Sequence, residues 1–207
     1  MNKMDEIILV APRVAVFSNE ELAFEGTLLS SEKPALVNAI SENIDGTVVS
    51  MRRGDAEENE DFKQPIPYGV LRSGDYIYAY ERLSGGGEGR LHNKVSIGVG
   101  GHMNPIEGMD TFSSLLMENL GRELEEELDI QSDFMNVAIK GYVNDDSDEV
   151  GRVHIGVLAD VMLSPTAKVT VRETEQLRGF WITVDELKRT EMYDRLENWS
   201  KIYVDMF

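Results

Sequence analysis

Six consecutive residues, Arg122 to Glu127, form the stretch of this chain whose residue types and spacing point most directly to chemistry. In a helix they would place Glu123, Glu126 and Glu127 on one face, because residues three and four apart are neighbours there. Like charges at this spacing repel each other by roughly 0.2–0.5 kcal/mol per pair. A divalent cation would remove that repulsion, and hard cations such as Mg²⁺ take oxygen ligands. The pattern therefore predicts a metal site on a helix.

The same run also matches an ordinary acidic helix with a solvated face, and taken alone it favours that interpretation. The flanking residues change the balance. Gly100 and Gly101 precede the run, and five residues separate Gly101 from Glu107. The aliphatic Ile130 comes after the last glutamate. These residues must therefore be considered together with the glutamates.

Together they resemble the signature of the Nudix hydrolases, the MutT-like family, written Gly-x5-Glu-x7-Arg-Glu-U-x-Glu-Glu-x-Gly-U, with U a bulky aliphatic residue. The residues that match the signature are Gly101, Glu107, Arg122, Glu123, Leu124, Glu126, Glu127 and Ile130. Two features depart from it. Asp129 stands where the family has glycine, and fourteen residues rather than seven separate Glu107 from Arg122.

The longer spacer has two interpretations. Seven additional residues are close to two helical turns, about 10 Å of axis, so a longer helix would keep its faces in register. Asp110 or Thr111 would cap such a helix. Its apolar stripe, facing a sheet, would be Phe112, Leu116, Leu120, Leu124 and Leu128. The alternative is a loop within residues 108–114 that restores the usual helix length, and the position of Glu107 depends on which one holds.

The remaining patterns predict how the helix is embedded. Strands are predicted in residues 5–17 with a break at Pro12, and in 47–52, 76–82, 94–99, 133–143 and 153–161. Helices are predicted in 33–44, before a turn at Asp45 and Gly46, and after the capping box at Thr183. A last helix is predicted where apolar residues recur at three- and four-residue steps, namely Met192, Leu196, Trp199, Tyr203 and Met206. This order predicts an α/β protein with a mixed β-sheet, and it agrees with the α/β/α sandwich that the Nudix resemblance implies. Residues 54–67 are acidic, contain two prolines and predict a loop. We therefore expect an N-terminal α+β extension, residues 1–65, and a Nudix domain, residues 66–207.

The resemblance implies a hydrolase that uses Mg²⁺ or Mn²⁺ to cleave the pyrophosphate bond of a nucleoside diphosphate linked to another group. The implied metal ligands are Glu123, Glu126, Glu127 and a backbone carbonyl of Gly100 or Gly101. Arg122 would orient a carboxylate, either Glu126 or Glu107. The general base stays open between Glu126, Glu107 and a carboxylate of the 145–149 or 173–175 loops.

Further residues are candidates for contact with a phosphorylated substrate. They are His102, Arg90, Arg152 and Glu175, with Glu173 or Glu175 as an additional ligand or base. For His102 and for His154, which is expected to share a strand face with Arg152, a structural role is the alternative. The glycine-rich turn before Arg90 lacks the Gly-Lys-Ser/Thr ending of a phosphate-binding P-loop.

Composition excludes several classes of function. Of the 207 residues, 38 are acidic and 20 basic, giving a net charge of −18, which argues against nucleic-acid and anionic-membrane binding. The chain has no cysteine, and no stretch is apolar for long enough to span a membrane. We expect a cytoplasmic enzyme acting on a phosphorylated, nucleotide-like small molecule, with a homodimer expected only by analogy. The alternatives are a non-catalytic nucleotide-binding or regulatory module and an acidic metal buffer.

Overall fold

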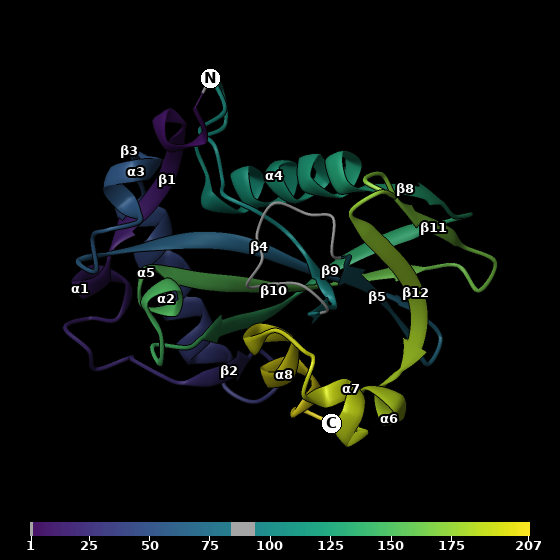
Figure 1. Ribbon diagram of the computed structural model, residues 1–207. Coiled ribbons are helices and arrows are strands. Elements are labelled where there is room, and N and C mark those ends of the chain that lie inside the picture. Colours follow the sequence, from purple (N-terminus) through teal and green to yellow (C-terminus); the bar gives the residue numbers. More distant parts are fainter. Residues whose placement is uncertain (1, 84–93) are drawn as a thin grey trace. The chain divides into compact units, whose positions relative to one another are not determined.

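The computed structural model describes residues 2–83 and 94–207 of the chain (Figure 1). The chain divides into two compact units, each assembled from three segments. Unit 1 contains Met1–Tyr68, Gly100–Gly121 and Lys140–Leu158, and unit 2 contains Gly69–Val99, Arg122–Ile139 and Ala159–Phe207. Residue 65 lies within a strand, and a boundary between an extension and a Nudix domain at that position stays a prediction.

Unit 1 contains most of the amino-terminal elements. They are the 3-10 helix η1 (Lys3–Asp5), β1 (Ile7–Pro12), α1 (Arg13–Val16), β2 (Gly26–Leu29), α2 (Pro34–Thr47), β3 (Val49–Arg52), α3 (Arg53–Ala56) and α5 (Glu149–Val153). Strand β1 pairs antiparallel with β3 and, through its last residues, with β4. The strand ends at Pro12, as predicted, because proline fixes φ and cannot donate to the next ladder bond.

Unit 2 contains the central and carboxy-terminal elements. They are β5 (Tyr76–Arg82), β6 (Val95–Ser96), β7 (Gly98–Val99), β8 (Leu128–Gln131), β11 (Lys168–Val171), β12 (Leu177–Thr183), α6 (Val184–Leu187), α7 (Thr190–Tyr193) and α8 (Asn198–Val204). Strand β5 pairs antiparallel with β12 over seven residue pairs. The predicted capping box is confirmed at the start of α6, where the Thr183 hydroxyl and the Glu186 carboxylate each accept from the other's backbone N–H.

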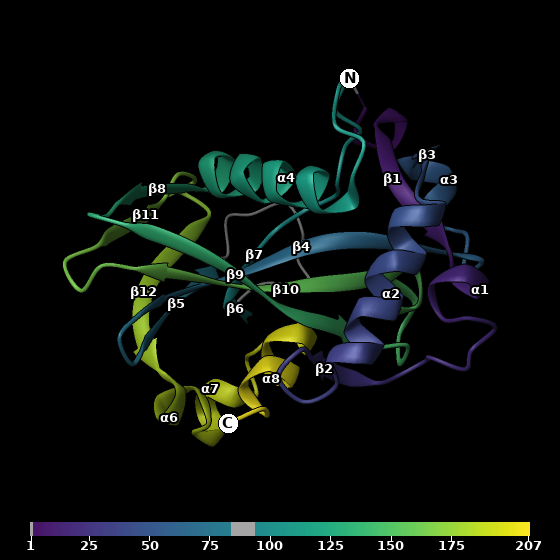
Figure 2. The same ribbon diagram turned by 180° about the vertical axis from the view of Figure 1, so that it is seen from behind.

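Four elements contribute residues to both units, namely β4 (Phe62–Ser73), α4 (Phe112–Glu127), β9 (Met135–Asn144) and β10 (His154–Leu163). The path through the large mixed sheet is β12-β5-β4-β10-β9-β2, and β8 and β11 form a separate two-stranded sheet. The predicted α/β class with a mixed sheet is confirmed. Figure 2 shows helix α2 beside α1 in unit 1.

The core of unit 1 contains the first half of the predicted apolar stripe of α4. The buried residues of this cluster are Leu9, Ala11, Val16, Phe17, Leu28, Val37, Ile40, Ile44, Met103, Phe112, Leu115, Leu116, Tyr142, Ile155 and Val157. All five residues of the stripe, from Phe112 to Leu128, are at most 5% exposed. The helical period predicted from the sequence is therefore confirmed over the whole length of α4.

Three local predictions were wrong because burial outweighed local propensity. Residues 62–67 of the predicted proline-containing loop form the start of β4, where Gln64 is completely buried. The predicted turn at Asp45 lies inside α2, which buries Ile44. Arg152 belongs to α5 and His154 begins β10, so the two do not share a strand face.

The predicted last helix is divided into α7 and α8 around Leu196. The backbone there bonds to β6 instead, since Val95 N–H donates to Arg195 and Glu197 N–H donates to Val95. The buried Leu196 thus occupies an extended position that a continuous helix would forbid. Within the described residues, no helix is both long and apolar enough to cross a membrane.

Candidate functional site

Helix α4 positions the glutamates that the sequence singled out. It is sixteen residues long and begins at Phe112, five positions after Glu107. Of the two interpretations of the spacer, the longer helix is therefore the one that agrees with the structure. The Thr111 hydroxyl accepts a hydrogen bond from Ser114 N–H at 3.3 Å, as a residue capping the helix does. Arg122 is ten residues into the helix, about 15 Å along its axis from Phe112.

The buried side of α4 changes from apolar to acidic along its length. Leu115, Asn119, Glu123 and Glu127 follow one another at four-residue steps. The first three of these are 6%, 0% and 8% exposed. A buried row that begins with leucine therefore ends with carboxylates, and burying a charge is costly unless it is paired.

Arg122 pairs with two of the carboxylates. Its Nη2 lies 2.8 Å from Glu123 Oε1, and its Nη1 lies 3.2 Å from Glu126 Oε2. The predicted pair with Glu126 is therefore present, and the pair with Glu123 was not anticipated. The side chain of Glu126 is 59% exposed and that of Glu123 is 11% exposed, so one guanidinium holds a solvated and a buried carboxylate together.

Glu127 is an acidic residue of α4 whose pKa departs far from its ordinary value. Burial and the neighbouring Glu123 raise its pKa to about 7, with Glu173 and Glu126 adding to the effect and Arg82 opposing it. The ionised form is disfavoured because the group is removed from water and faces like charges. Glu127 is thus a carboxyl group poised to exchange a proton near neutral pH.

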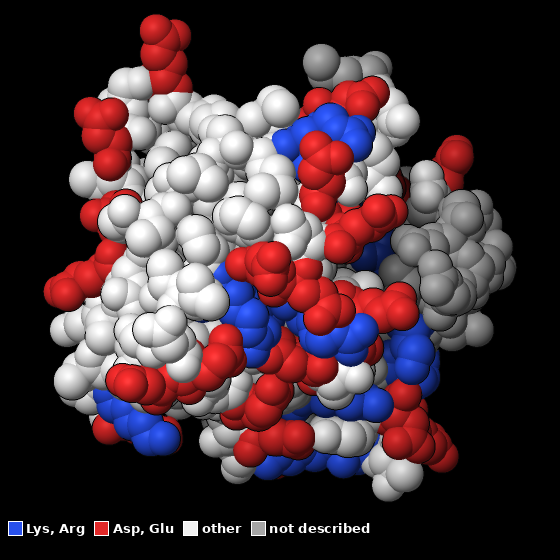
Figure 3. Space-filling model, turned by 90° about the vertical axis from the view of Figure 1, so that its left-hand side faces the viewer, with Lys and Arg blue, Asp and Glu red and all other residues white. Residues whose placement is uncertain are grey.

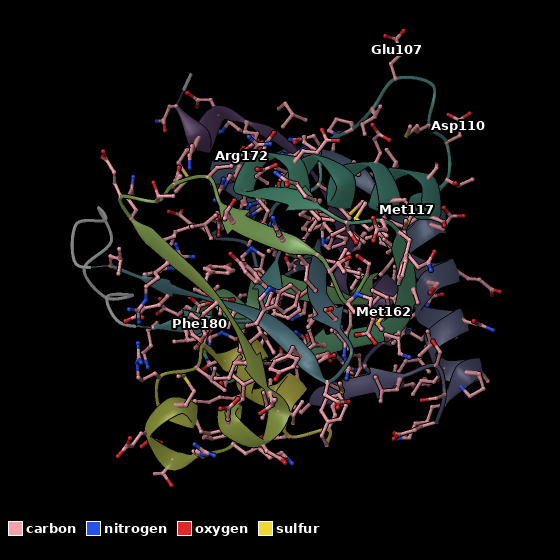
Figure 4. All side chains as sticks on the ribbon, turned by 90° about the vertical axis from the view of Figure 1, so that its right-hand side faces the viewer. Glu107, Asp110, Met117, Met162, Arg172 and Phe180 are labelled. Atoms are coloured by element: carbon pink, nitrogen blue, oxygen red, sulfur yellow. The ribbon has the colours of Figure 1, made fainter. Side chains whose placement is uncertain are left out.

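The small β8–β11 sheet brings Glu173 towards this cluster. Strand β8 follows α4 directly and pairs with β11, with Leu128 opposite Val171. The next residue, Arg172, caps α4: its backbone N–H donates to Glu127 O at 2.8 Å and its Nε donates to Glu125 O at 2.6 Å (Figure 4). A guanidinium here satisfies carbonyls that have no partner in the helix and complements the helix dipole.

The two departures from the family signature have structural explanations. Asp129 is a residue of β8, and the described non-glycine residues with positive φ are Ser18, Asn19 and Glu20, so position 129 does not require glycine. The helix ends at Glu127 rather than at Ile130, because β8 begins immediately afterwards. The longer spacer is accommodated by the longer α4 and the loop before it.

The glycine pair and Glu107 belong to unit 1. A Cβ on Gly100 would lie 1.7 Å from the carbonyl oxygen of Pro67, so only glycine permits this close backbone approach. Asn119 fixes the segment to α4, since its side chain accepts from Asn104 N–H and donates to Asn104 O. Glu107 is exposed on the loop before α4, and Figure 4 shows its side chain pointing outwards.

The other predicted substrate contacts are dispersed. His102 contacts Glu57 and His154 in unit 1, with His102 Nε2 3.3 Å from each. Arg152 pairs with Glu60 at 2.7 Å. Glu175 is exposed in the turn before β12, and Arg90 lies outside the described residues.

Sequence reasoning missed two partners of Glu127, both on β5. Arg82 bonds to Glu197 at 3.4 Å, and its charge acts on Glu127. Tyr80 donates to Gly98 O at 2.9 Å, and its pKa is raised well above the usual value by burial and by Glu127. The alternation of β5 indicated which of its residues share a face, but no sequence pattern connected that face with α4.

The acidic cluster fits a hard divalent cation. Its donors are carboxylate oxygens, which are the ligands of Mg²⁺ and Mn²⁺. The raised pKa of Glu127 is the expected sign of a carboxyl group that is removed from water beside other carboxylates. Glu123, Glu126 and Glu127 are the residues that would hold such an ion.

Comparisons with known proteins bear on the fold and on the family of the chain. No protein-family model matches the chain. Protein YmaB of Bacillus subtilis is 51% identical over 207 residues, which are 100% of this chain and 99% of that protein. The crystal structure of Tm1382, named as a candidate Nudix hydrolase, superimposes with a TM-score of 0.76 and 26% identity over 97% of both chains.

A more distant structure shares the fold. DR0079 from Deinococcus radiodurans has a TM-score of 0.51 and 15% identity, covering 77% of this chain and 90% of that one. The predicted Nudix-type fold is therefore confirmed. With this fold and the signature residues on α4, the chain belongs to the Nudix hydrolase family.

Proposed function

We propose that this chain is a metal-dependent hydrolase that cleaves a pyrophosphate bond in a nucleoside-diphosphate-linked or related phosphorylated small molecule. Membership of the Nudix hydrolase family supports a pyrophosphatase-type hydrolase in general. The observation that carries the finer proposal is the arrangement at the end of α4, where Arg122 lies 2.8 Å from Glu123 and 3.2 Å from Glu126, and where burial beside these carboxylates raises the pKa of Glu127. A site that gathers carboxylates at such a cost is suited to a divalent cation.

Mg²⁺ or Mn²⁺ is the proposed cofactor, held by Glu123, Glu126 and Glu127. When bound, it would supply charge neutralisation for a phosphoanhydride and lower the pKa of a water. The predicted carbonyl ligands on Gly100 and Gly101 rest on the resemblance alone. The net charge of −18 would repel a phosphorylated substrate, so local positive charge is needed at the site.

The chain's own residues have distinct roles in this proposal. Arg122 holds Glu123 and Glu126 in place and is a positioning residue. Arg172 fixes the carboxyl end of α4, and the adjacent Glu173 contributes negative charge close to Glu127. The general base stays open between Glu126, Glu107 and a carboxylate of the 145–149 or 173–175 loops.

The decisive experiment is a panel of dinucleotide, nucleotide-sugar and other diphosphate compounds, incubated with the full chain and Mg²⁺ or Mn²⁺. Release of a monophosphate that stops on chelation is the expected result. Binding of a panel compound without any turnover would instead favour the non-catalytic module. A Glu127→Gln variant run in parallel separates the activity of this chain from contaminating phosphatases.

A further inference from the structure

A second cluster of metal-ligand side chains lies in unit 1. Glu57 caps the end of α3, His102 follows the glycine pair, and His154 begins β10. One ligand atom from each lies within 4.8 Å of the other two. Among residues 2–83 and 94–207, this is the one group of three such residues that meets that distance.

The ring of His154 is fixed with a lone pair facing the cluster. Its Nδ1 lies 2.7 Å from the backbone oxygen of Val150. A carbonyl oxygen only accepts, so Nδ1 carries the proton, and the Nε2 of the neutral ring carries a lone pair. Metal-binding histidines are oriented in this way by a carbonyl partner on the other ring nitrogen. His154 is 7% exposed, so the protein holds this orientation rather than the solvent.

His102 lies between two electron-pair donors. Its Nε2 is 3.3 Å from His154 Nε2 and 3.3 Å from Glu57 Oε1, with the two rings nearly perpendicular at 67°. One N–H on His102 cannot form a full hydrogen bond with both neighbours at once. The lone pair of His154 Nε2 and the carboxylate of Glu57 therefore both face His102 Nε2.

The spacing matches the edges of a tetrahedral site. Bonds of about 2.0–2.2 Å from a zinc-like ion to nitrogen and oxygen place neighbouring ligand atoms about 3.3 Å apart. Two of the three separations in the cluster are 3.3 Å. Imidazole nitrogen favours zinc and its neighbours in the transition series over Mg²⁺.

We propose that Glu57, His102 and His154 bind one divalent transition metal of the zinc class, through two imidazole nitrogens and a carboxylate oxygen. Water would supply the fourth ligand, since the side chains of Glu57 and His102 are 24% and 13% exposed. Arg53 donates to Glu57 Oε1 at 3.2 Å and positions that carboxylate. This site differs from the acidic cluster of α4 because two of its donor atoms are imidazole nitrogens, because its residues belong to unit 1, and because it favours transition metals over Mg²⁺.

The ion would act as a cross-link within unit 1. It would join three segments separated by about fifty residues of chain, and such links stabilise the folded state over the unfolded one. The proposal does not depend on the hydrolase activity, since its residues and its readout are separate from those of α4.

The test uses the full chain, freed of metal with a chelator and titrated with Co²⁺ or Zn²⁺. We expect one equivalent to bind with the visible spectrum of a tetrahedral cobalt site with nitrogen ligands, to raise Tm, and to resist an excess of Mg²⁺. His102→Gln and His154→Gln should each lower the affinity by more than the ~10–100-fold that loss of an outer partner costs.

Matched controls separate this site from other carboxylates. Glu57→Gln should weaken binding, whereas Glu60→Gln, which alters the partner of Arg152 in the same unit, should leave it unchanged. Glu127→Gln should retain the full equivalent, because that residue belongs to α4. Unchanged cobalt binding in folded His102→Gln protein would overturn the proposal, as would the absence of a bound equivalent in the wild type. His102 is the less buried histidine, so its variant serves if His154→Gln does not fold.

Discussion

The last turns of α4 hold Glu123, Glu126 and Glu127 within five residues of sequence, whereas Glu57, His102 and His154 come from segments about fifty residues apart. The α4 cluster offers oxygen donors under mutual repulsion, and burial among them raises the pKa of Glu127 to about 7. In unit 1, the hydrogen bond from His102 lowers the pKa of Glu57 to about 2. The comparison shows that one chain can place candidate metal ligands in two electrostatic environments, one repulsive and one in which the carboxylate is already paired.

The largest expected effect tests the repulsive cluster. Glu127→Gln should remain folded and lower kcat by ~10³-fold or more, about 4 kcal/mol of barrier, because a proposed metal ligand is lost. Steady-state rates with the best panel substrate and Mg²⁺ measure it. Glu125→Gln is the matched control, since Glu125 is exposed and points about 100° away from its neighbours. An unchanged rate in the Glu127 variant would remove this residue from the site.

The second expected effect concerns selectivity between the two clusters. His102→Gln should abolish tight cobalt binding yet leave the Mg²⁺ concentration for half-maximal hydrolysis unchanged, because the α4 ligands are oxygens. Glu127→Gln should produce the reverse pattern. Isothermal titration and activity measured against Mg²⁺ concentration provide the two readouts. A loss of both properties in either variant would contradict the view that the clusters are independent.

The third expected effect is an opposite pH dependence of stability without metal. Glu127 binds more protons when folded, so its contribution to stability should fall as pH rises from about 4.5 to about 7, by roughly 3 kcal/mol at most. Glu57 and His154 have lowered pKa values, the latter about 4 through burial. Their contributions to the free energy of unfolding should be lost as the pH falls. The loss should occur between pH 4.5 and 2 for Glu57 and between pH 6.5 and 4 for His154.

Chemical denaturation in the presence of a chelator, repeated across this pH range, measures the effect. Glu127→Gln should remove the loss between pH 4.5 and 7 while retaining the loss at lower pH. A slope that is the same in the variant and the wild type would show that Glu127 ionises normally in the folded protein.

The smallest expected effect concerns the cap of α4. Arg172→Gln should lower stability by about 1 kcal/mol, since it removes a charged donor from the helix carbonyls. It should also reduce kcat modestly through displacement of Glu173. Arg178→Gln is a suitable control because that side chain is 68% exposed in its pair with Glu81. Thermal melts of both variants decide the matter, and equal melting temperatures would exclude a capping role for Arg172.

The sequence predicts the α4 cluster to a much greater extent than the cluster of Glu57, His102 and His154. Contacts between residues three or four apart determine the helical period of α4, the buried stripe from Phe112 to Leu128 and the pair between Arg122 and Glu126. The spacing of residues in the sequence shows such contacts directly. The sequence left open whether the spacer lengthened the helix. It also gave no reason to join Glu173 or Arg82 to Glu127, because strand pairing brings them there.

The sequence alone determined the family signature, the α/β class and the acidic end of α4, since each depends on neighbours along the chain. Only the tertiary structure decided that Glu57, His102 and His154 converge, that residues 62–67 form a strand and that Leu196 divides the last helix. Those outcomes depend on burial and pairing between distant segments. The gain from such long-range contacts exceeds local preferences, and a single sequence does not show which segments will meet.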